Sequence, residues 1–150
     1  MKTITEWFDE YSDSHQNKTN KAIHWVCVPA ILFSIIGIIA HFSALLTALL
    51  LVLTLVFYAR LDLVLAIAMM VLIAIMAWLI YILPVVVGFY IGVFIVAWMG
   101  QFYGHKVEGK KPSFFKDLQF LLIGPVWCMD AYLAKVFPNW KSRQLGLSNS

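Results

Sequence analysis

The uncharged stretch at residues 63–103 reads LVLAIAMMVLIAIMAWLIYILPVVVGFYIGVFIVAWMGQFY. It contains no Asp, Glu, Lys or Arg. A helix that crosses the hydrocarbon core of a bilayer needs about 20 apolar residues, so this stretch is long enough to cross twice. Pro84 divides it near its middle, where proline favours the end of a helix. We therefore predict two membrane-spanning helices, roughly at residues 63–82 and 85–103.

The run before it, at residues 22–59, is also uncharged. Its length predicts two more spans, roughly at 23–40 and 43–59, with a tight reversal near His41. Of the whole chain, 62% is hydrophobic and only 13% is charged, against about 25% charged residues in soluble domains. The composition therefore predicts an all-α fold, a polytopic membrane helix bundle. Because the net charge is only +3 and the lysines are scattered, nothing indicates a nucleic-acid partner.

Two shorter segments flank the four spans. Residues 3–14 carry apolar side chains at helical spacing, which predicts a short interfacial helix with one apolar face: Ile4, Trp7, Phe8 and Tyr11. Residues 118–134 are apolar but contain Gly124-Pro125 and Asp130, and three basic residues follow, namely Lys135, Lys141 and Arg143. We expect a broken or re-entrant fifth helix there, with a full fifth crossing as the alternative.

We expect one membrane domain over residues 1–150, with an N-terminal segment at 1–21, four spans within 22–103, a loop at 104–117, the fifth helix at 118–135 and a polar tail at 136–150. Basic residues gather at one side of the four spans, namely Lys2, Lys18, Lys21, Arg60, Lys106, Lys110, Lys111 and Lys116. The positive-inside rule therefore predicts a cytoplasmic N-terminus and a cytoplasmic 104–117 loop. No signal peptide is visible, which fits a multi-pass protein of a bacterial inner membrane or of the endoplasmic reticulum.

Three of the four histidines fall on that predicted side: His15, His24 and His105. His41 lies alone at the opposite turn. In one continuous helix His15 and His24 would face opposite directions, so their convergence requires a turn within residues 14–19. Gln101, His105 and Glu108 share a face if the fourth span continues past residue 103, a continuation that Gly104 and Gly109 leave open.

Imidazoles together with a carboxylate are typical of a zinc site and of a non-haem Fe(II) site that activates oxygen. The alternative is that the histidines are interfacial side chains bonded to backbone, lipid headgroups or water, with Asn20 and Gln101 as helix-end polar residues. A non-catalytic lipid-binding or assembly protein and a zinc-dependent lipid hydrolase therefore stay open, as does a homo-oligomer. Cys27 and Cys128 lie in apolar segments without CxxC spacing and are interpreted as inert thiols.

Two motifs carry a family resemblance. The first is Tyr11-x3-His15-x4-Asn20-x3-His24-x4-Pro29, and the second is Trp98-x2-Gln101-x2-Gly104-His105-x2-Glu108-x3-Pro112, followed by an apolar segment with Pro125. In their order and in the layout of spans around them, they resemble the 2-hydroxy fatty acid dioxygenase family. That family includes a fungal endoplasmic-reticulum enzyme of phytosphingosine breakdown and bacterial members. The resemblance covers almost the whole chain.

The resemblance implies a non-haem iron enzyme. Its implied reaction is Fe(II)-dependent α-oxidation, in which a long-chain 2-hydroxy fatty acid and O2 give the fatty acid one carbon shorter and CO2. It implies His15, His24 and His105 as metal ligands, with Asn20 and Gln101 as supporting polar groups. For the carboxylate ligand it favours Glu108 first and Asp130 second. We further expect a substrate tail among the spans, with its carboxylate steered by Lys18, Lys21, Lys110 or Lys111.

Overall fold

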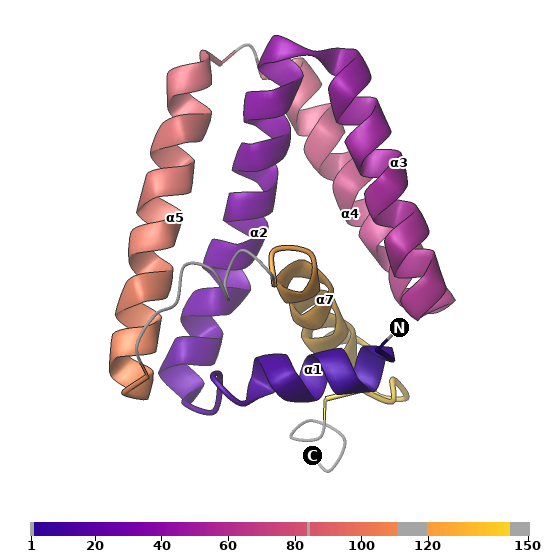
Figure 1. Cartoon of the computed structure of the whole chain (residues 1–150), viewed down its shortest axis with the longest axis vertical. Helices are drawn as coiled ribbons and strands as arrows, with labels where there is room; N and C mark the ends of the chain where they lie inside the picture. Colours follow the sequence, from indigo (N-terminus) through magenta and orange to yellow (C-terminus); the bar gives the residue numbers. More distant parts are fainter. Residues whose placement is uncertain (1, 84, 111–119, 145–150) are drawn as a thin grey trace.

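Figure 1 shows the computed structural model, which describes residues 2–83, 85–110 and 120–144 as six α-helices without strands. Four of the helices are long and apolar enough to cross a membrane, and their bounds are α2 (Lys18–Phe42), α3 (Ala44–Leu61), α4 (Leu63–Ile82) and α5 (Val87–Glu108). The four predicted spans are confirmed. Helices α2 and α5 extend several residues beyond the predicted spans at the end that carries the histidines.

Helix α1 (Ile4–Ser12) lies across that end of the bundle (Figure 1). Its first turn is closed by a capping box: the Thr3 hydroxyl accepts from the Glu6 amide, and the Glu6 carboxylate accepts from the Thr3 amide. On the predicted apolar face, three side chains are buried, namely Ile4, Phe8 and Tyr11, and Trp7 is half-buried. The helix that residues 3–14 predict is therefore present, and its apolar face packs on the bundle.

Helix α7 (Ile123–Val136) is the predicted fifth helix. With 14 residues, α7 is about 21 Å long. This is shorter than the hydrocarbon core of a bilayer, which is about 30 Å thick. Pro125 lies in its first turn, where the missing N–H costs no helical hydrogen bond, so the proline begins the helix instead of breaking it. α7 packs against α1, α2 and α4 (Figure 1), and the Tyr58 hydroxyl of α3 donates to the Leu122 carbonyl at 2.6 Å. Helix α7 therefore packs among the other helices at the end of the bundle that carries the histidines.

The closest helix pair is α2 and α5, which run side by side (Figure 1). A methyl group built on Gly37 of α2 would lie 2.3 Å from the Tyr90 ring of α5. One built on Gly100 of α5 would lie 2.6 Å from the Cys27 sulfur of α2. Small residues let membrane helices approach closely, and here they hold together the two helices that carry His24 and His105.

We expect Gly37→Ala to destabilise the protein by about 1–3 kcal/mol, because the added methyl must displace the buried Tyr90 ring. Gly92→Ala on α5 is the matched control, since its methyl meets nothing within 4 Å. Thermal unfolding of both variants in the same detergent measures the difference. Equal unfolding temperatures for the two variants would show that the Tyr90 ring can move aside without loss of stability.

Candidate metal centre

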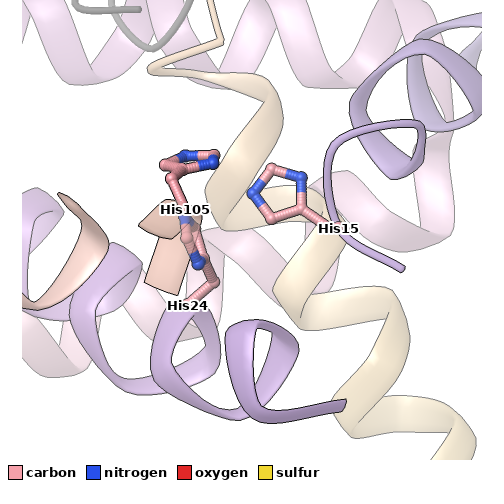
Figure 2. A group of neighbouring side chains, drawn as sticks. All are labelled: His15, His24 and His105. Carbon is pink, nitrogen blue, oxygen red and sulfur yellow. The ribbon is translucent and has the colours of Figure 1, made fainter. Parts of the chain in front are cut away.

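Three histidines from three separate segments meet at one end of the bundle (Figure 2). His15 lies between α1 and α2, His24 lies in α2, and His105 lies in α5. All three are buried, and one ring nitrogen from each lies within 4.8 Å of the others. The ring centroids are separated by 4.3 Å for His15 and His24, 5.2 Å for His15 and His105, and 4.9 Å for His24 and His105. Imidazoles gathered at this scale are typical metal ligands.

The turn that the histidine spacing requires is present. Helix α1 ends at Ser12 and α2 begins at Lys18, with Asn17 as its N-cap. The Asn17 side chain accepts from the amides of Thr19 and Asn20 at 2.8 and 3.4 Å, which satisfies two donors at the start of α2. The reversal turns His15 back toward His24, so the convergence depends on this cap.

Two of the imidazoles are oriented by backbone carbonyls of their own segment. His15 Nδ1 donates to the Tyr11 carbonyl at 2.6 Å, and His24 Nδ1 donates to the Asn20 carbonyl at 3.0 Å. A carbonyl can only accept, so each Nδ1 carries a proton, and in the neutral form of the ring the lone pair is then on Nε2. This is the tautomer and the outer contact that metal-binding histidines usually show. His15 Nε2 is buried and has no hydrogen-bond partner among the described residues.

The surroundings of His15 are aromatic. The Tyr11 ring stacks on the His15 ring at a centroid distance of 4.2 Å, and the Trp127 ring lies at 5.7 Å. Burial, and after it the neighbouring His24, lower the pKa of His15 from 6.5 to about 3. His15 is therefore neutral at neutral pH, and neutral imidazole is the form that binds metals.

Burial also raises the pKa of the Cys128 thiol well above its usual range, so this thiol stays protonated.

Glu108, the first carboxylate candidate, lies outside the histidine group. Its two oxygens accept from the backbone amides of Gln16 and Asn17, each at 2.9 Å, and from Asn20 Nδ2 at 3.0 Å. Because the turn between α1 and α2 exposes amides that need acceptors, the carboxylate at the end of α5 binds there. Glu108 thus ties the helix that carries His105 to the turn that carries His15.

Asn20 completes this connection. Its Nδ2 also donates to the Ser14 carbonyl at 3.1 Å, next to His15. Its Oδ1 would lie 2.4 Å from a methyl group built on Gly104, so only glycine fits at that position of α5. The sequence marked Gly104 as a possible helix end, but α5 continues through it and ends at Gly109, which has a φ of 76°. The role of Gly104 is close packing beside the site, which the sequence did not indicate.

Asp130, the second carboxylate candidate, also lies outside the group. It is fully buried in α7 and accepts from the Trp140 indole at 3.0 Å, the Ser142 hydroxyl at 2.5 Å and the Arg143 amide. Arg143 in turn forms an ion pair with Asp62 at 2.6 Å, at the turn between α3 and α4. Asp130 therefore anchors the segment after α7 to the bundle.

Gln101 and the lysines lie on, or next to, the segments that carry the histidines. Gln101 is buried one helical turn before His105 and lines a small cavity that α1, α2, α5 and the start of α7 enclose together. Lys18 is exposed and Lys21 half-buried at the start of α2, and Lys110 donates to the Asp13 carbonyl. Lys111 lies outside the described residues. The positive charges of Lys18, Lys21 and Lys110 thus lie on segments next to the histidine group.

Residues 1–136 match the model of a protein family described as 2-hydroxy-palmitic acid dioxygenase Mpo1-like. The match runs from the N-terminus to the last residue of α7, so it contains all three histidines and both carboxylate candidates. No curated protein and no solved structure matches the chain significantly. The family that the two sequence motifs indicate is thereby confirmed.

Proposed function

The chain belongs to the Mpo1-like family, and from that premise we propose that it is a membrane dioxygenase acting on a long-chain 2-hydroxy fatty acid. The observation that carries the proposal is the convergence of His15, His24 and His105, all buried, from three separate segments. Burying three imidazoles together is costly unless they share a ligand or a hydrogen-bond network. A resident metal ion is the simplest ligand for this donor set.

Fe(II) is the metal that fits both the donors and the described family. The buried Nε2 of His15, which lacks a partner among the described residues, is the kind of atom that a metal would satisfy. Imidazole nitrogens are suitable ligands for both Fe(II) and zinc, so the choice of iron rests on the dioxygenase description of the family. Held by His15, His24 and His105, the metal would supply the redox chemistry that activates O2 and a Lewis acid that polarises the substrate's oxygens.

The protein's own residues position the substrate. Tyr11 and Trp127 pack on His15 and keep water from that side of the site. The charges of Lys21 and Lys110 attract the substrate carboxylate. Gln101 offers a polar side chain in the wall of the small cavity that Tyr11 also lines. We place this end of the bundle on the cytoplasmic side, because the basic residues gather there.

The proposed reaction balances without a further reductant. One 2-hydroxy acid and one O2 give the acid that is one carbon shorter, one CO2 and one water. The bond between C1 and C2 breaks, and C1 leaves as CO2. C2 changes from an alcohol to a carboxylic acid, so the substrate loses four electrons in total, which reduce O2 completely.

The test is to purify the protein anaerobically in detergent and measure bound metals by mass spectrometry. Fe(II) and O2 are then supplied with 2-hydroxypalmitic acid labelled at C1. We expect stoichiometric iron, labelled CO2 and the shorter acid, with product formation dependent on O2. Zinc with an O2-independent lipid hydrolysis would replace the proposal by a hydrolase, and a protein that binds no metal would overturn it.

A further inference from the structure

An apolar cleft of about 560 Å³ lies between α2 and α3. Its walls are aliphatic side chains of the two helices together with the Phe57 ring, completed by Leu121 and Leu122 just before α7. Thr47 and Thr54 are its polar residues, and the Thr47 hydroxyl donates to the Ser43 carbonyl inside its own helix. Leu50 and Leu53 on its rim are exposed, so the cleft opens sideways toward the membrane. A hydrocarbon chain is the ligand that such walls accept.

The cleft leads toward the histidines. It shares Leu32 and Leu121 with a small cavity of about 20 Å³, which is also lined by Tyr11 and Gln101. Tyr11 stacks on His15, and Gln101 lies one helical turn before His105. The small cavity holds little more than one water. Because Leu32 and Leu121 line both cavities, their side chains lie at the boundary between the wide cleft and the edge of the site.

A second apolar cleft, of about 510 Å³, lies on the other side of α2, against α5. Among the described residues, it shares none with the small cavity. The packed cluster of Ile31, Ala97 and Trp98 lies between them, and Gly100 lies so close to Cys27 that a methyl group does not fit. This second cleft therefore has no comparable route to the histidines.

We propose that the α2–α3 cleft binds the acyl tail of the substrate and that Leu32 and Leu121 separate it from the head-group site. The assignment rests on the proposed function for the identity of the substrate. From His24 to Ile39, helix α2 rises about 22 Å, the length of an extended long-chain acyl group. The substrate enters sideways from the bilayer, with its carboxylate toward the histidines.

The cleft selects by length more than by affinity. A tail that moves from lipid into the cleft exchanges one apolar surrounding for another, so little hydrophobic free energy is gained. Its position, however, decides whether the 2-hydroxyl reaches the histidines, because the whole acyl chain must fit between His24 and the far end of the cleft at Ile39. Obstruction of the cleft should therefore change chain-length preference while short substrates still react.

The first experiment compares Thr54→Trp, which fills the cleft from α3, with Val52→Trp, an exposed residue of α3 outside it. Turnover is measured with 2-hydroxy acids of increasing length. We expect Thr54→Trp to lower the ratio of long-chain to short-chain turnover at least tenfold, and Val52→Trp to leave it unchanged. Val96→Trp, which fills the second cleft, should also leave it unchanged. An unaltered ratio in Thr54→Trp, or a shift in Val96→Trp, would overturn the assignment.

The second experiment does not need turnover. A 2-hydroxy fatty acid with a photoreactive diazirine near its chain end is crosslinked to the metal-free protein, and the labelled residues are identified by mass spectrometry. We expect labels within residues 35–39 and 50–54. Labels spread over all lipid-facing residues would mean simple partitioning and would overturn the assignment. Labels in the cleft of a protein that oxidises no 2-hydroxy acid would support acyl binding there and reject the proposed reaction.

Discussion

Replacing any one of His15, His24 or His105 with alanine is expected to abolish stoichiometric metal binding and turnover. Each ring supplies one of the three nitrogens that lie within 4.8 Å of one another, and among the residues that the structure describes no carboxylate belongs to the group. The loss in metal affinity should exceed the 10–100-fold that is typical of outer contacts, because a direct ligand is removed. Metal content after dialysis against limiting Fe(II), together with product formation, measures both effects.

The matched control for the three substitutions is His41→Ala. His41 is exposed at the opposite turn, so its loss should leave metal and activity unchanged. Since a buried alanine also leaves a cavity, His→Gln variants test the same positions with a side chain of similar size, and thermal unfolding reports whether the fold survives. Full metal content and full turnover in a folded His15, His24 or His105 variant would reject the metal centre.

Glu108→Ala is expected to weaken metal binding about 10–100-fold without removing the site. The carboxylate accepts from the amides of Gln16 and Asn17 and from Asn20, so its loss releases the turn that holds His15 against α5. At saturating metal the variant should still reach the wild-type stoichiometry. The metal affinity of Glu108→Gln should lie between those of the wild type and Glu108→Ala. The glutamine oxygen can still accept a hydrogen bond, but its NH2 group faces N–H donors and cannot accept from them.

A titration with Fe(II) under anaerobic conditions distinguishes this positioning role from direct ligation. If Glu108 were a ligand, Glu108→Gln would lose metal as completely as the histidine variants. Asp130→Asn is the control for a carboxylate that stabilises the fold elsewhere. It should lower the unfolding temperature, because it disturbs the contacts with Trp140, Ser142 and Arg143, and leave the metal dissociation constant unchanged. A wild-type dissociation constant in Glu108→Ala would refute the positioning role.

Much of the site was predictable because histidines at a helix end are rare in an apolar chain and their spacing limits how they meet. The turn between His15 and Asn20 follows from helical geometry alone. The carboxylates were not predictable in the same way. A glutamate near the end of a helix binds a metal or caps a turn, depending on which amides come within reach, and those of Gln16 and Asn17 are far from Glu108 in sequence.

Hydropathy and length, which are properties of continuous segments, determined by themselves the four spans and the apolar face of α1. They did so because a bilayer requires long uncharged helices whatever their neighbours are. Tertiary structure alone decided that α7 packs inside the histidine end, that Gly104 must be small, and that Glu108 and Asp130 bind backbone and side-chain donors outside the histidine group. Each of these depends on contacts between distant segments, and close packing of side chains has no signature in the spacing of residues.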